Sequence, residues 1–469
     1  MNLLGLDFGT TSLKAAVFDL NGNCMFSHEE TYELIHQGGF IEFDAEKYWN
    51  ILKRTIDLVT QQFSISALAI DTQCETMILA DEQGNPLCNA IVWLDNRAEL
   101  EAYNIKKDFG NELIYNFTGQ CDISGIWPAC KLLWVKNNRP DVWEKTRKIF
   151  LLEDYLLYKL TGRFVTQKTL QSSSLYMDIQ KGCWWNKMLE YIGIQEDMLP
   201  SLLDSGVYVS DYKRISVATS AMDQAAAAIG AGIYKEGTIS EMTGTAMAIF
   251  SPSNSMPKFN KDILIPCHYN ATTRYAIMPW ISTAGMALKW FRDNFVQDMS
   301  YSQLDMLAKD SPQGSDGLMF FPHLCGSTHP IFNPEAKGSF YGIRLSHEKK
   351  HFVRAILESV SYMLRSSISS LNSDIETIHS IGGSAKSDLW CQIKADVTQK
   401  RIKTLKEKET ACKGSAILSG LAINEYTSLK SACEKAVVID KEFNPENSKY
   451  EKLYNDYTSI NEKIYERCK

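Results

Sequence analysis

The stretch that decides the fold reads Leu3-Leu4-Gly5-Leu6-Asp7-Phe8-Gly9-Thr10-Thr11-Ser12-Leu13-Lys14-Ala15-Ala16-Val17-Phe18. Apolar residues run up to Asp7 and again after Lys14, and a turn of one glycine and three hydroxyl residues separates the two runs. The pattern predicts a buried strand, a small-residue turn and a returning strand, closed by the tight-turn pair Asn21-Gly22. Such a turn offers backbone N–H groups and hydroxyls to an anion without a bulky side chain in the way.

Two charged residues flank this turn. Asp7 at the end of the first strand can hold a hydrated Mg²⁺, and Lys14 on the returning strand can offset phosphate charge. An ordinary hairpin with a polar turn fits the same residues, so the motif alone leaves both interpretations open.

A second stretch repeats the pattern in the middle of the chain. Residues 239–250 run from an apolar strand through the turn Thr243-Gly244-Thr245 into another apolar strand. Two such hairpins, one near the start of each half, indicate two related halves that face one nucleotide. Neither is a Walker loop, because no Gly-Lys-Ser/Thr follows either glycine. By analogy of fold, we expect the phosphate clamp of the actin–hexokinase type, in which two β-turns grip a triphosphate between domains.

Composition limits the class of protein. At 469 residues the chain is too long for one core, so we expect two large domains, residues 1–235 and 236–469. The net charge is −7 with no basic tract, which argues against nucleic acid or an anionic membrane as the main partner. The N-terminus enters a strand directly and no apolar run reaches spanning length, so a cytoplasmic protein is expected.

The twelve cysteines and eight histidines are scattered along the chain. The closest cysteines are Cys121 and Cys130, and no Cys-x-x-Cys occurs, so we expect free and mostly buried thiols. His347 and His351 have helical spacing, but no third ligand accompanies them, and a zinc site is not predicted there.

Polar side chains follow two predicted buried strands in the first half. The strand at 67–70 leads into Asp71-Thr72-Gln73-Cys74-Glu75-Thr76, and the strand at 90–93 leads into Leu94-Asp95-Asn96-Arg97. Because α/β folds place ligand contacts at strand ends, Gln73–Glu75 and Asp95–Arg97 are candidate substrate contacts. A solvated loop tip explains either segment equally well when it is taken singly.

Two further segments are candidates for ligand contacts. Asp223-Gln224 opens a helix of small residues, where a carboxylate can face the cleft or can simply complement the helix dipole. Gly382-Gly383-Ser384-Ala385 precedes another helix and lets a flat ring or ribose approach the backbone. Most tryptophans between 98 and 210 are expected in the core, and one near the substrate end can stack on an apolar sugar face.

These residues resemble a known family along the whole chain, the FGGY carbohydrate kinases. Residues 7–12 are similar to its first phosphate motif, Thr243-Gly244-Thr245 to its second, and Gly382-Gly383-Ser384-Ala385-Lys386-Ser387 to its adenosine motif. One family signature lies in residues 128–138, although Ile126 stands where an aromatic residue, Met, Gly or Ser is usual. The other signature is met at Gly338, Phe340, Gly342, Ile343, His351, Phe352, Ala355, Ile356, Leu357 and Glu358.

The resemblance implies an α/β fold of two ribonuclease-H-like domains with the substrate in the cleft between them. It also implies ATP-dependent phosphorylation of a hydroxyl, with ATP and Mg²⁺ as cofactors and Asp223 as the catalytic base. The implied nucleotide contacts are Gly9, Thr10, Thr11, Ser12, Lys14, Thr243, Gly244, Thr245, Gly382, Gly383, Ser384 and Ser387. The implied substrate contacts are Gln73, Cys74, Glu75, Asp95, Trp127, Asp223 and Gln224, and the implied metal contacts are Asp7 and Asp223.

The identity of the substrate depends on a few positions. Gln73-Cys74-Glu75-Thr76 resembles the Gln-Arg-Glu-Thr of glycerol kinases, but Cys74 stands where those kinases use an arginine to bind glycerol. The Met-His-Gly of xylulose kinases is absent, whereas Lys131-Leu132-Leu133-Trp134-Val135 matches their layout. We therefore expect a pentulose such as xylulose. A glycerol or polyol kinase, a gluconate-type sugar-acid kinase and a non-kinase actin-like ATPase stay open as alternatives, as does a homodimer.

Overall fold

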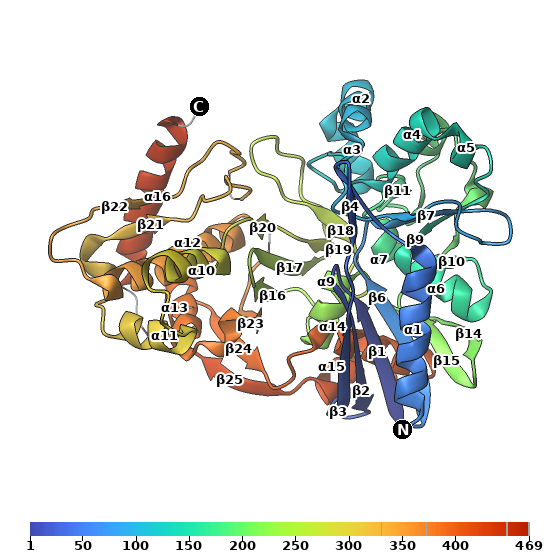
Figure 1. The fold of residues 1–469 in the computed structure, drawn as a ribbon. Coiled ribbons are helices and arrows are strands. Elements are labelled where there is room, and N and C mark those ends of the chain that lie inside the picture. Colours follow the sequence, from blue (N-terminus) through green and yellow to red (C-terminus); the bar gives the residue numbers. More distant parts are fainter. Residues whose placement is uncertain (330, 372, 447–448, 468–469) are drawn as a thin grey trace.

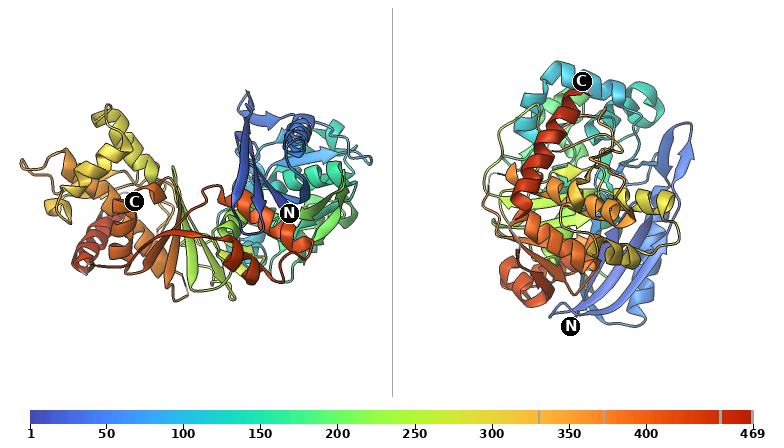
Figure 2. Two further views of the ribbon diagram at one scale, coloured as in Figure 1. Left: turned by 90° about the horizontal axis from the view of Figure 1, so that it is seen from below. Right: turned by 90° about the vertical axis from the view of Figure 1, so that its left-hand side faces the viewer.

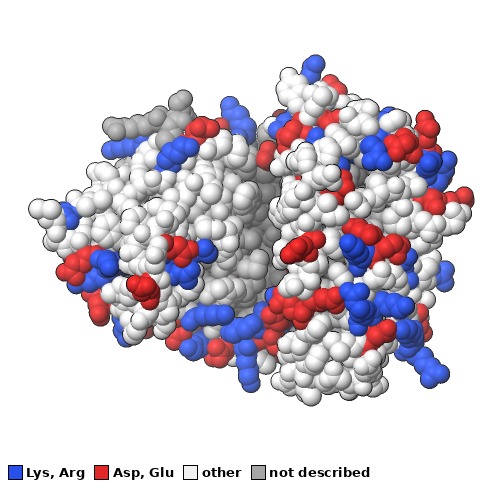
Figure 3. Space-filling view, in the orientation of Figure 1, with Lys and Arg blue, Asp and Glu red and all other residues white. Residues whose placement is uncertain are grey.

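The computed structural model describes residues 1–329, 331–371, 373–446 and 449–467, which fold into two lobes (Figure 1). The first lobe, on the right in Figure 1, contains the N-terminal strands, and the second lobe, on the left, carries the C-terminal helix. A furrow separates the lobes in the space-filling view (Figure 3). The predicted α/β fold of two domains with a cleft between them is confirmed.

The first lobe is built on a six-stranded sheet in the order β14-β15-β6-β1-β2-β3. β1, β2 and β3 form an antiparallel meander, whereas β6 and β15 lie on the other side of β1 and run parallel to it. β1 is apolar almost throughout because a central strand is covered on both faces. The strands are β1 (Asn2–Phe8), β2 (Ser12–Asp19), β3 (Cys24–Thr31), β6 (Ile65–Thr72), β14 (Tyr208–Tyr212) and β15 (Ile215–Thr219).

The second lobe repeats this topology. Its main sheet has the order β18-β19-β17-β16-β23-β24-β25, in which β17 is antiparallel to β16 while β23 and β24 run parallel. The strands are β16 (Thr238–Thr243), β17 (Met247–Ser253), β18 (Cys267–Tyr269), β19 (Tyr275–Ile277), β20 (Trp280–Ile281), β23 (Thr377–Gly382), β24 (Arg401–Leu405) and β25 (Ile439–Phe443). The series β19-β17-β16-β23-β24 matches β3-β2-β1-β6-β15 in order and direction, so the two predicted hairpins occupy equivalent places.

Helices cover both faces of the first sheet. Leu4, Leu6 and Phe8 of β1 belong to a buried cluster that includes residues of α1 (Ala45–Thr60) and α6 (Leu152–Thr161). The opposite face belongs to a cluster with α9 (Asp223–Gly230), α14 (Thr410–Ala422) and α15 (Leu429–Ala436). In the second lobe, α12 (Lys349–Ser369) and α13 (Asp388–Thr398) share the core cluster with the sheet, and α16 (Tyr450–Arg467) packs beside α13.

The helices α9 and α14, from different halves of the chain, pack backbone to backbone on the first sheet. A Cβ atom on Gly414 would lie 1.8 Å from the carbonyl oxygen of Ala226, and one on Gly230 would lie 1.9 Å from that of Thr410. α14 also presses on β1, where a Cβ on Gly5 would lie 1.7 Å from the oxygen of Cys412. Figure 2 (left) shows the orange-red α14 beneath the blue strands. The domain boundary near residue 235 remains a prediction. Helices from beyond it, α14 and α15, complete the hydrophobic core of the first lobe.

A second junction is the bridging arm, which we define as residues 254–277 of the second half. Cys267 N donates to the carbonyl oxygen of Gly119 at 2.9 Å, and the rings of Phe259 and Tyr115 lie 5.6 Å apart. His268 is buried against the first lobe, where its Nδ1 lies 3.1 Å from Ser172 Oγ. The arm therefore reaches from the second sheet to the top of the first lobe (Figure 1).

The remaining elements extend the lobes around these sheets. A five-stranded sheet in the first lobe has the order β4-β5-β8-β7-β9. Its strands are β4 (Ile35–Gln37), β5 (Phe40–Phe43), β7 (Met77–Ala80), β8 (Ala90–Ile91) and β9 (Lys148–Leu151). The other short strands are β10 (Val165–Gln167), β11 (Met177–Asp178), β12 (Cys183–Trp184), β13 (Ser201–Leu203), β21 (Met319–Phe321) and β22 (Ser339–Tyr341). The other helices are α2 (Glu99–Phe109), α3 (Asn111–Thr118), α4 (Pro128–Asn138), α5 (Pro140–Trp143), α7 (Lys168–Gln171), α8 (Asn186–Ile192), α10 (Gly285–Phe295) and α11 (Tyr301–Lys309).

Two expectations about the chain as a whole concern its cysteines and its helices. The cysteines within the described ranges are free thiols and most of them are buried, as predicted. Over those same residues, none of the helices combines the length and the apolar character that crossing a bilayer requires.

We predict that Gly414→Ala destabilises the protein by about 3 kcal/mol or more, because the added Cβ can be accommodated only by moving α9 and α14 apart. Gly244→Ala is the matched control, since no atom lies within 4 Å of the Cβ position there. Thermal unfolding of both variants measures the difference. Equal midpoints for Gly414→Ala and the wild type would contradict the backbone contact.

Candidate active site

Three carboxylates converge where β1, β6 and α9 meet. The parallel register of β1 and β6 sets Asp7 beside Asp71, and Asp223 is the first residue of α9. Burial raises the pKa of Asp7, and burial together with the neighbouring charge of Asp7 raises the pKa of Asp71 well above its ordinary value. The same two causes raise the pKa of Asp223 to about 7. Such a concentration of acids is typical of a functional site.

Asp71 ties this cluster to the second half of the chain. Its side chain is fully buried, and its Oδ2 accepts a hydrogen bond from Ser415 Oγ of α14 at 2.5 Å. Ser415 Oγ also lies 2.6 Å from Ser220 Oγ, three residues before Asp223. Within the described part of the chain, no N–H or hydroxyl donates to Asp71 Oδ1, and the side-chain partner left to Asp71 is the carboxyl group of Asp7, whose proximity helps to raise the pKa of Asp71. Two adjacent buried carboxyl groups cannot both carry a charge without a proton or a cation between them.

Asp223 keeps one oxygen available. Its Oδ1 accepts from the backbone N–H of Gln224 at 2.7 Å and from Cys74 Sγ at 3.6 Å. Neither contact uses Oδ2, and the side chain retains partial solvent exposure at the floor of the cleft. The predicted contacts Cys74, Asp223 and Gln224 are therefore brought together.

The first hairpin has an open backbone and occupied hydroxyls. Gly9 N donates to Ser12 O at 3.0 Å, and a Cβ on Gly9 would meet only Ser12 O, at 3.6 Å. Thr10 Oγ1 accepts from Trp93 Nε1 at 2.9 Å, whereas Ser12 Oγ donates to Glu29 Oε1 at 2.7 Å. Thr11 is exposed. The hairpin thus presents the Gly9–Thr11 backbone to the cleft while two of its three hydroxyls stabilise the turn.

Lys14 of β2 lies directly opposite Asp7 of β1 in the antiparallel pair. Its Nζ is 3.1 Å from Glu409 Oε2, and both side chains are more than a third exposed. An exposed pair of this kind contributes little to stability, so Lys14 can exchange Glu409 for an anionic ligand.

The second hairpin is likewise open on the cleft side. Gly244 N donates to Ala246 O at 2.9 Å, and no atom lies within 4 Å of the Gly244 Cβ position. Gly244 and Thr245 are exposed. From behind, α10 supports the turn, since a Cβ on Gly285 would lie 2.2 Å from Gly244 O.

The predicted adenosine turn adjoins the second hairpin. Gly383 N donates to Thr243 O at 3.1 Å, and both Gly382 and Gly383 are exposed. Gly382 has a φ of 81°, which favours glycine. Ser387 differs from the others because its Oγ accepts from Trp390 N at 3.1 Å and caps α13. Its hydroxyl therefore has a structural partner already.

The predicted substrate contacts Gln73 and Glu75 follow the end of β6. Gln73 Nε2 donates to Tyr48 Oη at 3.0 Å, while its Oε1 is buried without a partner. Burial raises the pKa of Glu75. The fully buried Lys131 of α4 donates to the carbonyl oxygens of Glu75, at 3.1 Å, and Val92, at 2.9 Å, so one ammonium group holds both polar strand ends together. Burial lowers the pKa of Lys131 to about 7.

Asp95 is engaged by neighbouring residues. Arg97 Nε donates to its Oδ1 at 2.8 Å, and Arg97 Nη2 and Ile41 N donate to its Oδ2 at 2.7 and 2.5 Å. The Arg97 guanidinium lies over the Phe40 ring, 4.0 Å from its centroid. Burial acts to raise the pKa of Asp95, but these hydrogen bonds outweigh it and lower the pKa. Trp127, at the start of α4, is half-buried and donates from Nε1 to Asp122 O at 3.0 Å.

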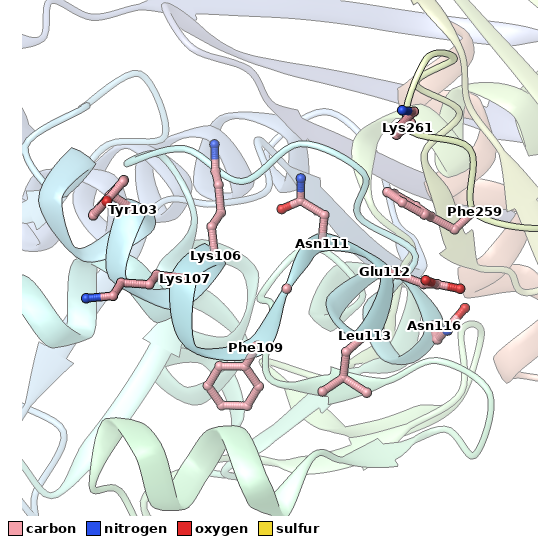
Figure 4. Close-up of a pocket in the computed structure, with 11 residues that line it drawn as sticks. Tyr103, Lys106, Lys107, Phe109, Asn111, Glu112, Leu113, Asn116, Phe259 and Lys261 are labelled. Atoms are coloured by element: carbon pink, nitrogen blue, oxygen red, sulfur yellow. The ribbon is translucent and has the colours of Figure 1, made fainter.

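One cavity lies apart from these residues. It has a volume of about 890 Å³ and lies between α2, α3 and the bridging arm (Figure 4). Lys106, Lys107 and Lys261 stand around it, with Phe109 and Leu113 at its apolar side. It contains none of the predicted contacts.

Asp71, Ser415, Glu241 and Lys394 were not among the residues predicted to have a role, and Lys131 was noted only as part of a family signature. For Asp71, Glu241 and Lys131 the sequence does contain a sign of importance. Glu241 and Asp71 interrupt apolar strands, and Lys131 interrupts an apolar helix. A buried charged residue of this kind needs a partner, which the sequence does not identify.

Models of one protein family match both halves of the chain. The N-terminal domain model of the FGGY family of carbohydrate kinases matches residues 2–232, and the C-terminal domain model of that family matches residues 243–423.

Relatives with three different names cover nearly the whole chain. A xylulose kinase of Staphylococcus epidermidis is 29% identical over 488 residues, which cover 100% of this chain and 97% of that protein. A gluconokinase of Bacillus subtilis is 27% identical, covering 92% and 90%. A glycerol kinase of Thermococcus gammatolerans is 29% identical, covering 94% and 93%.

Solved structures show the same arrangement of lobes. A ligand-bound xylulose kinase from Lactobacillus acidophilus superposes with a TM-score of 0.90 at 25% identity, covering 100% of both chains. The glycerol kinase of Plasmodium falciparum with ADP also gives a TM-score of 0.90, at 26% identity, covering 100% of this chain and 98% of that chain.

We predict that Asp223→Asn stabilises the ligand-free protein at pH 8. The raised pKa of Asp223 means that its contribution to stability is present below its ordinary pKa of 3.8 and is lost as the pH rises through about 7. Asparagine stays neutral, so the variant should gain about 2 kcal/mol at pH 8 and nothing at pH 4, a partly exposed carboxylate being screened by solvent.

Thermal melts between pH 4 and 8 measure this gain. Asp81→Asn is the control, because hydrogen bonds from Asn85 lower the pKa of Asp81 and the variant should lose stability as the pH rises. Parallel pH curves for Asp223→Asn and the wild type would contradict the electrostatic description of the cluster.

Proposed function

The chain belongs to the FGGY family of carbohydrate kinases, and on that premise we propose that it transfers the γ-phosphate of ATP to a hydroxyl of a neutral pentulose such as xylulose. One observation carries the proposal. Each lobe has a glycine hairpin in which a Cβ atom would meet no close contact, with nothing within 4 Å at Gly244 and only Ser12 O at 3.6 Å at Gly9, and Asp223 is partly exposed with Oδ2 left open. Two backbone cradles and one carboxylate are what phosphoryl transfer to an alcohol requires.

The proposed nucleotide site uses backbone groups more than hydroxyls. The Gly9–Thr11 backbone and the Gly244–Thr245 backbone would hold the phosphates, with Lys14 adding positive charge. The exposed Gly382-Gly383 turn would receive the adenosine. Thr10, Ser12, Thr243, Ser384 and Ser387 stay in the proposed set, chiefly through their main chain, because their hydroxyls already have protein partners.

The acid cluster fits a hydrated magnesium ion. Among the described residues, no group of three or more His, Cys, Asp or Glu side chains is arranged to hold a metal directly. Mg²⁺ usually keeps several waters and binds through one or two carboxylates plus substrate phosphates, which suits Asp7 and Asp223. The buried carboxyl of Asp71 beside Asp7 supports the same assignment, since a cation would offset the charge of the two acids. When bound, the ion would neutralise charge on the phosphates.

Asp223 is proposed as the general base. Gln224 N and Cys74 Sγ fix its Oδ1, which leaves Oδ2 to accept the proton of the substrate hydroxyl. A pKa of about 7 places this carboxylate near the value at which a base works best at neutral pH. Narrowing the cleft around the acids would exclude water and limit ATP hydrolysis.

The contacts of the sugar pocket support a neutral substrate. A sugar acid would need a free cation, but Arg97 is held by Asp95 and Glu42, and Lys131 is held by two carbonyl oxygens. Gln73, Glu75 and Gln224 can share the hydroxyls of a polyol, and Trp127 can cover its apolar face. Cys74 lacks the reach of an arginine, which favours a substrate longer than glycerol. The choice rests on these contacts, because the names of the relatives include xylulose, gluconate and glycerol kinases.

We predict that a panel of ketoses, polyols and aldonates identifies a pentulose as the best acceptor in a coupled ADP-release assay. Asp223→Asn should lower kcat by roughly 10²–10⁴, the usual worth of a positioned base, with smaller changes in the binding of ATP and sugar. ADP release that ignores every sugar would instead indicate an actin-like ATPase. Near-normal turnover of Asp223→Asn would mean that Asp223 is not the base and only complements the dipole of α9.

We also predict that Glu75→Ala raises the KM for the sugar at least roughly tenfold, since a charged hydrogen bond to a hydroxyl is lost. The KM for ATP is the internal control and should change less than about twofold. Glycerol as the best acceptor, or an unchanged sugar KM, would contradict this assignment of the pocket.

A cytoplasmic location and a homodimer both remain predictions from the sequence.

A further inference from the structure

A buried ion pair lies behind the two predicted nucleotide turns of the second lobe. Lys394 of α13 and Glu241 of β16 have fully buried side chains, and the distance from Nζ to Oε1 is 2.5 Å. Neither residue is among the predicted nucleotide, substrate or metal contacts. Removing two charges from water is costly unless hydrogen bonds satisfy the remaining atoms of the pair.

Three hydroxyls complete the hydrogen bonding of this pair. Lys394 Nζ donates to Ser384 Oγ at 2.7 Å and lies 3.5 Å from both Thr243 Oγ1 and Ser380 Oγ. On the acidic side, Thr243 Oγ1 donates to Glu241 Oε2 at 2.6 Å, and Ser380 Oγ donates to Glu241 Oε1. We call Glu241, Thr243, Ser380, Ser384 and Lys394 the buried network.

The buried network joins two turns that the sequence separates by more than a hundred residues. Thr243 opens the second hairpin, and Ser384 follows the Gly382-Gly383 turn. In front of the network, Gly383 N donates to Thr243 O at 3.1 Å. The strands that lead into the two turns, β16 and β23, already pair in parallel up to Thr243 and Gly382. Beyond this ladder, the two turns are connected by the Gly383–Thr243 backbone hydrogen bond and by the ammonium group of Lys394.

We propose that the Glu241–Lys394 pair is a positioning element that, beyond the end of the β16–β23 ladder, fixes the orientation of the phosphate turn at 243–245 relative to the adenosine turn at 382–384. Neither side chain reaches the cleft, so the pair acts through Thr243 and Ser384. A site held in its binding geometry before the ligand arrives avoids the cost of ordering two loops on binding. The inference rests on the proposed function, because it assumes that these turns bind a nucleotide.

The buried network also determines which atoms face the ligand. Because the hydroxyls of Thr243 and Ser384 point inward to the ion pair, the two residues offer main-chain groups to the cleft. A lysine and a glutamate together add no net charge behind the triphosphate. The pair thereby stiffens the turns without changing the sign of the field that the nucleotide meets.

A purely structural role would predict something different, and the chain offers a matched control. Arg354 and Glu358 of α12 form another largely buried pair in the same lobe, with Nε 2.8 Å from Oε1. The other partners of Glu358 are Gly314, Ser315 and Tyr450, none of which lies in the turns. Breaking this pair should lower thermal stability without affecting the nucleotide.

The test compares ADP affinity, measured by calorimetric titration, in Lys394→Met, Glu241→Gln, Ser384→Ala and the control Glu358→Gln. We expect the first two variants to raise the Kd for ADP at least tenfold and Ser384→Ala to raise it about threefold. The sugar KM at saturating ATP should stay within about twofold, and Glu358→Gln should bind ADP as the wild type does.

Where removal of one charge prevents folding, the double variant Glu241→Gln/Lys394→Met and Ser384→Ala carry the test, since neither leaves an unpaired buried charge. Wild-type ADP affinity in either of these folded variants would overturn the inference. So would an equal loss of affinity in Glu358→Gln. ADP binding without phosphorylation of any sugar would overturn the proposed function alone, whereas a wild-type protein that fails to bind ADP would overturn both.

Discussion

The contact on which the rest of the structure depends is the approach of α9, α14 and β1 without intervening side chains. Gly5, Gly230 and Gly414 each face a carbonyl oxygen at a distance that excludes a Cβ atom. This contact places the first residue of α9, Asp223, over the ends of β1 and β6, and it brings Ser415 of α14 to Asp71. The acids are therefore positioned by a core to which both halves of the chain contribute, and not by the first half alone.

In each lobe, a buried lysine supports the segments that carry the predicted ligand contacts. In the first lobe, the buried Lys131 joins the ends of two polar segments through carbonyl oxygens. In the second lobe, the buried Lys394 joins two turns through hydroxyls and Glu241. Both ammonium groups are buried and bonded to protein atoms, so neither is exposed to the cleft. Lys14 is the basic side chain that acts on the pKa of Asp7, and the raised pKa values of the three acids favour ligands that bring positive charge.

Local patterns were enough to predict the hairpins, because glycine and hydroxyl residues between apolar runs have few other structures available to them. They also select Gln73, Glu75 and Asp223 as candidate contacts, because these residues follow or begin buried elements, and their roles remain predictions. What the sequence could not give was the direction of each hydroxyl: Ser12, Thr243, Ser384 and Ser387 face protein partners. Asp71, Ser415 and Lys394 were not predicted because Asp71 and Ser415 lie 344 residues apart and Lys394 lies 153 residues from Glu241, and these pairs meet only through strand register and helix packing.

The bridging arm has a mechanical consequence. The second half of the chain meets the first lobe at two separate places: its helices α14 and α15 pack against the first sheet, and Cys267 N of the arm donates to Gly119 O. In Figure 1 these places lie at opposite ends of the first lobe. A relative movement that keeps both attachments is limited mainly to rotation about the line between them. We expect the furrow to open and close by such a rotation.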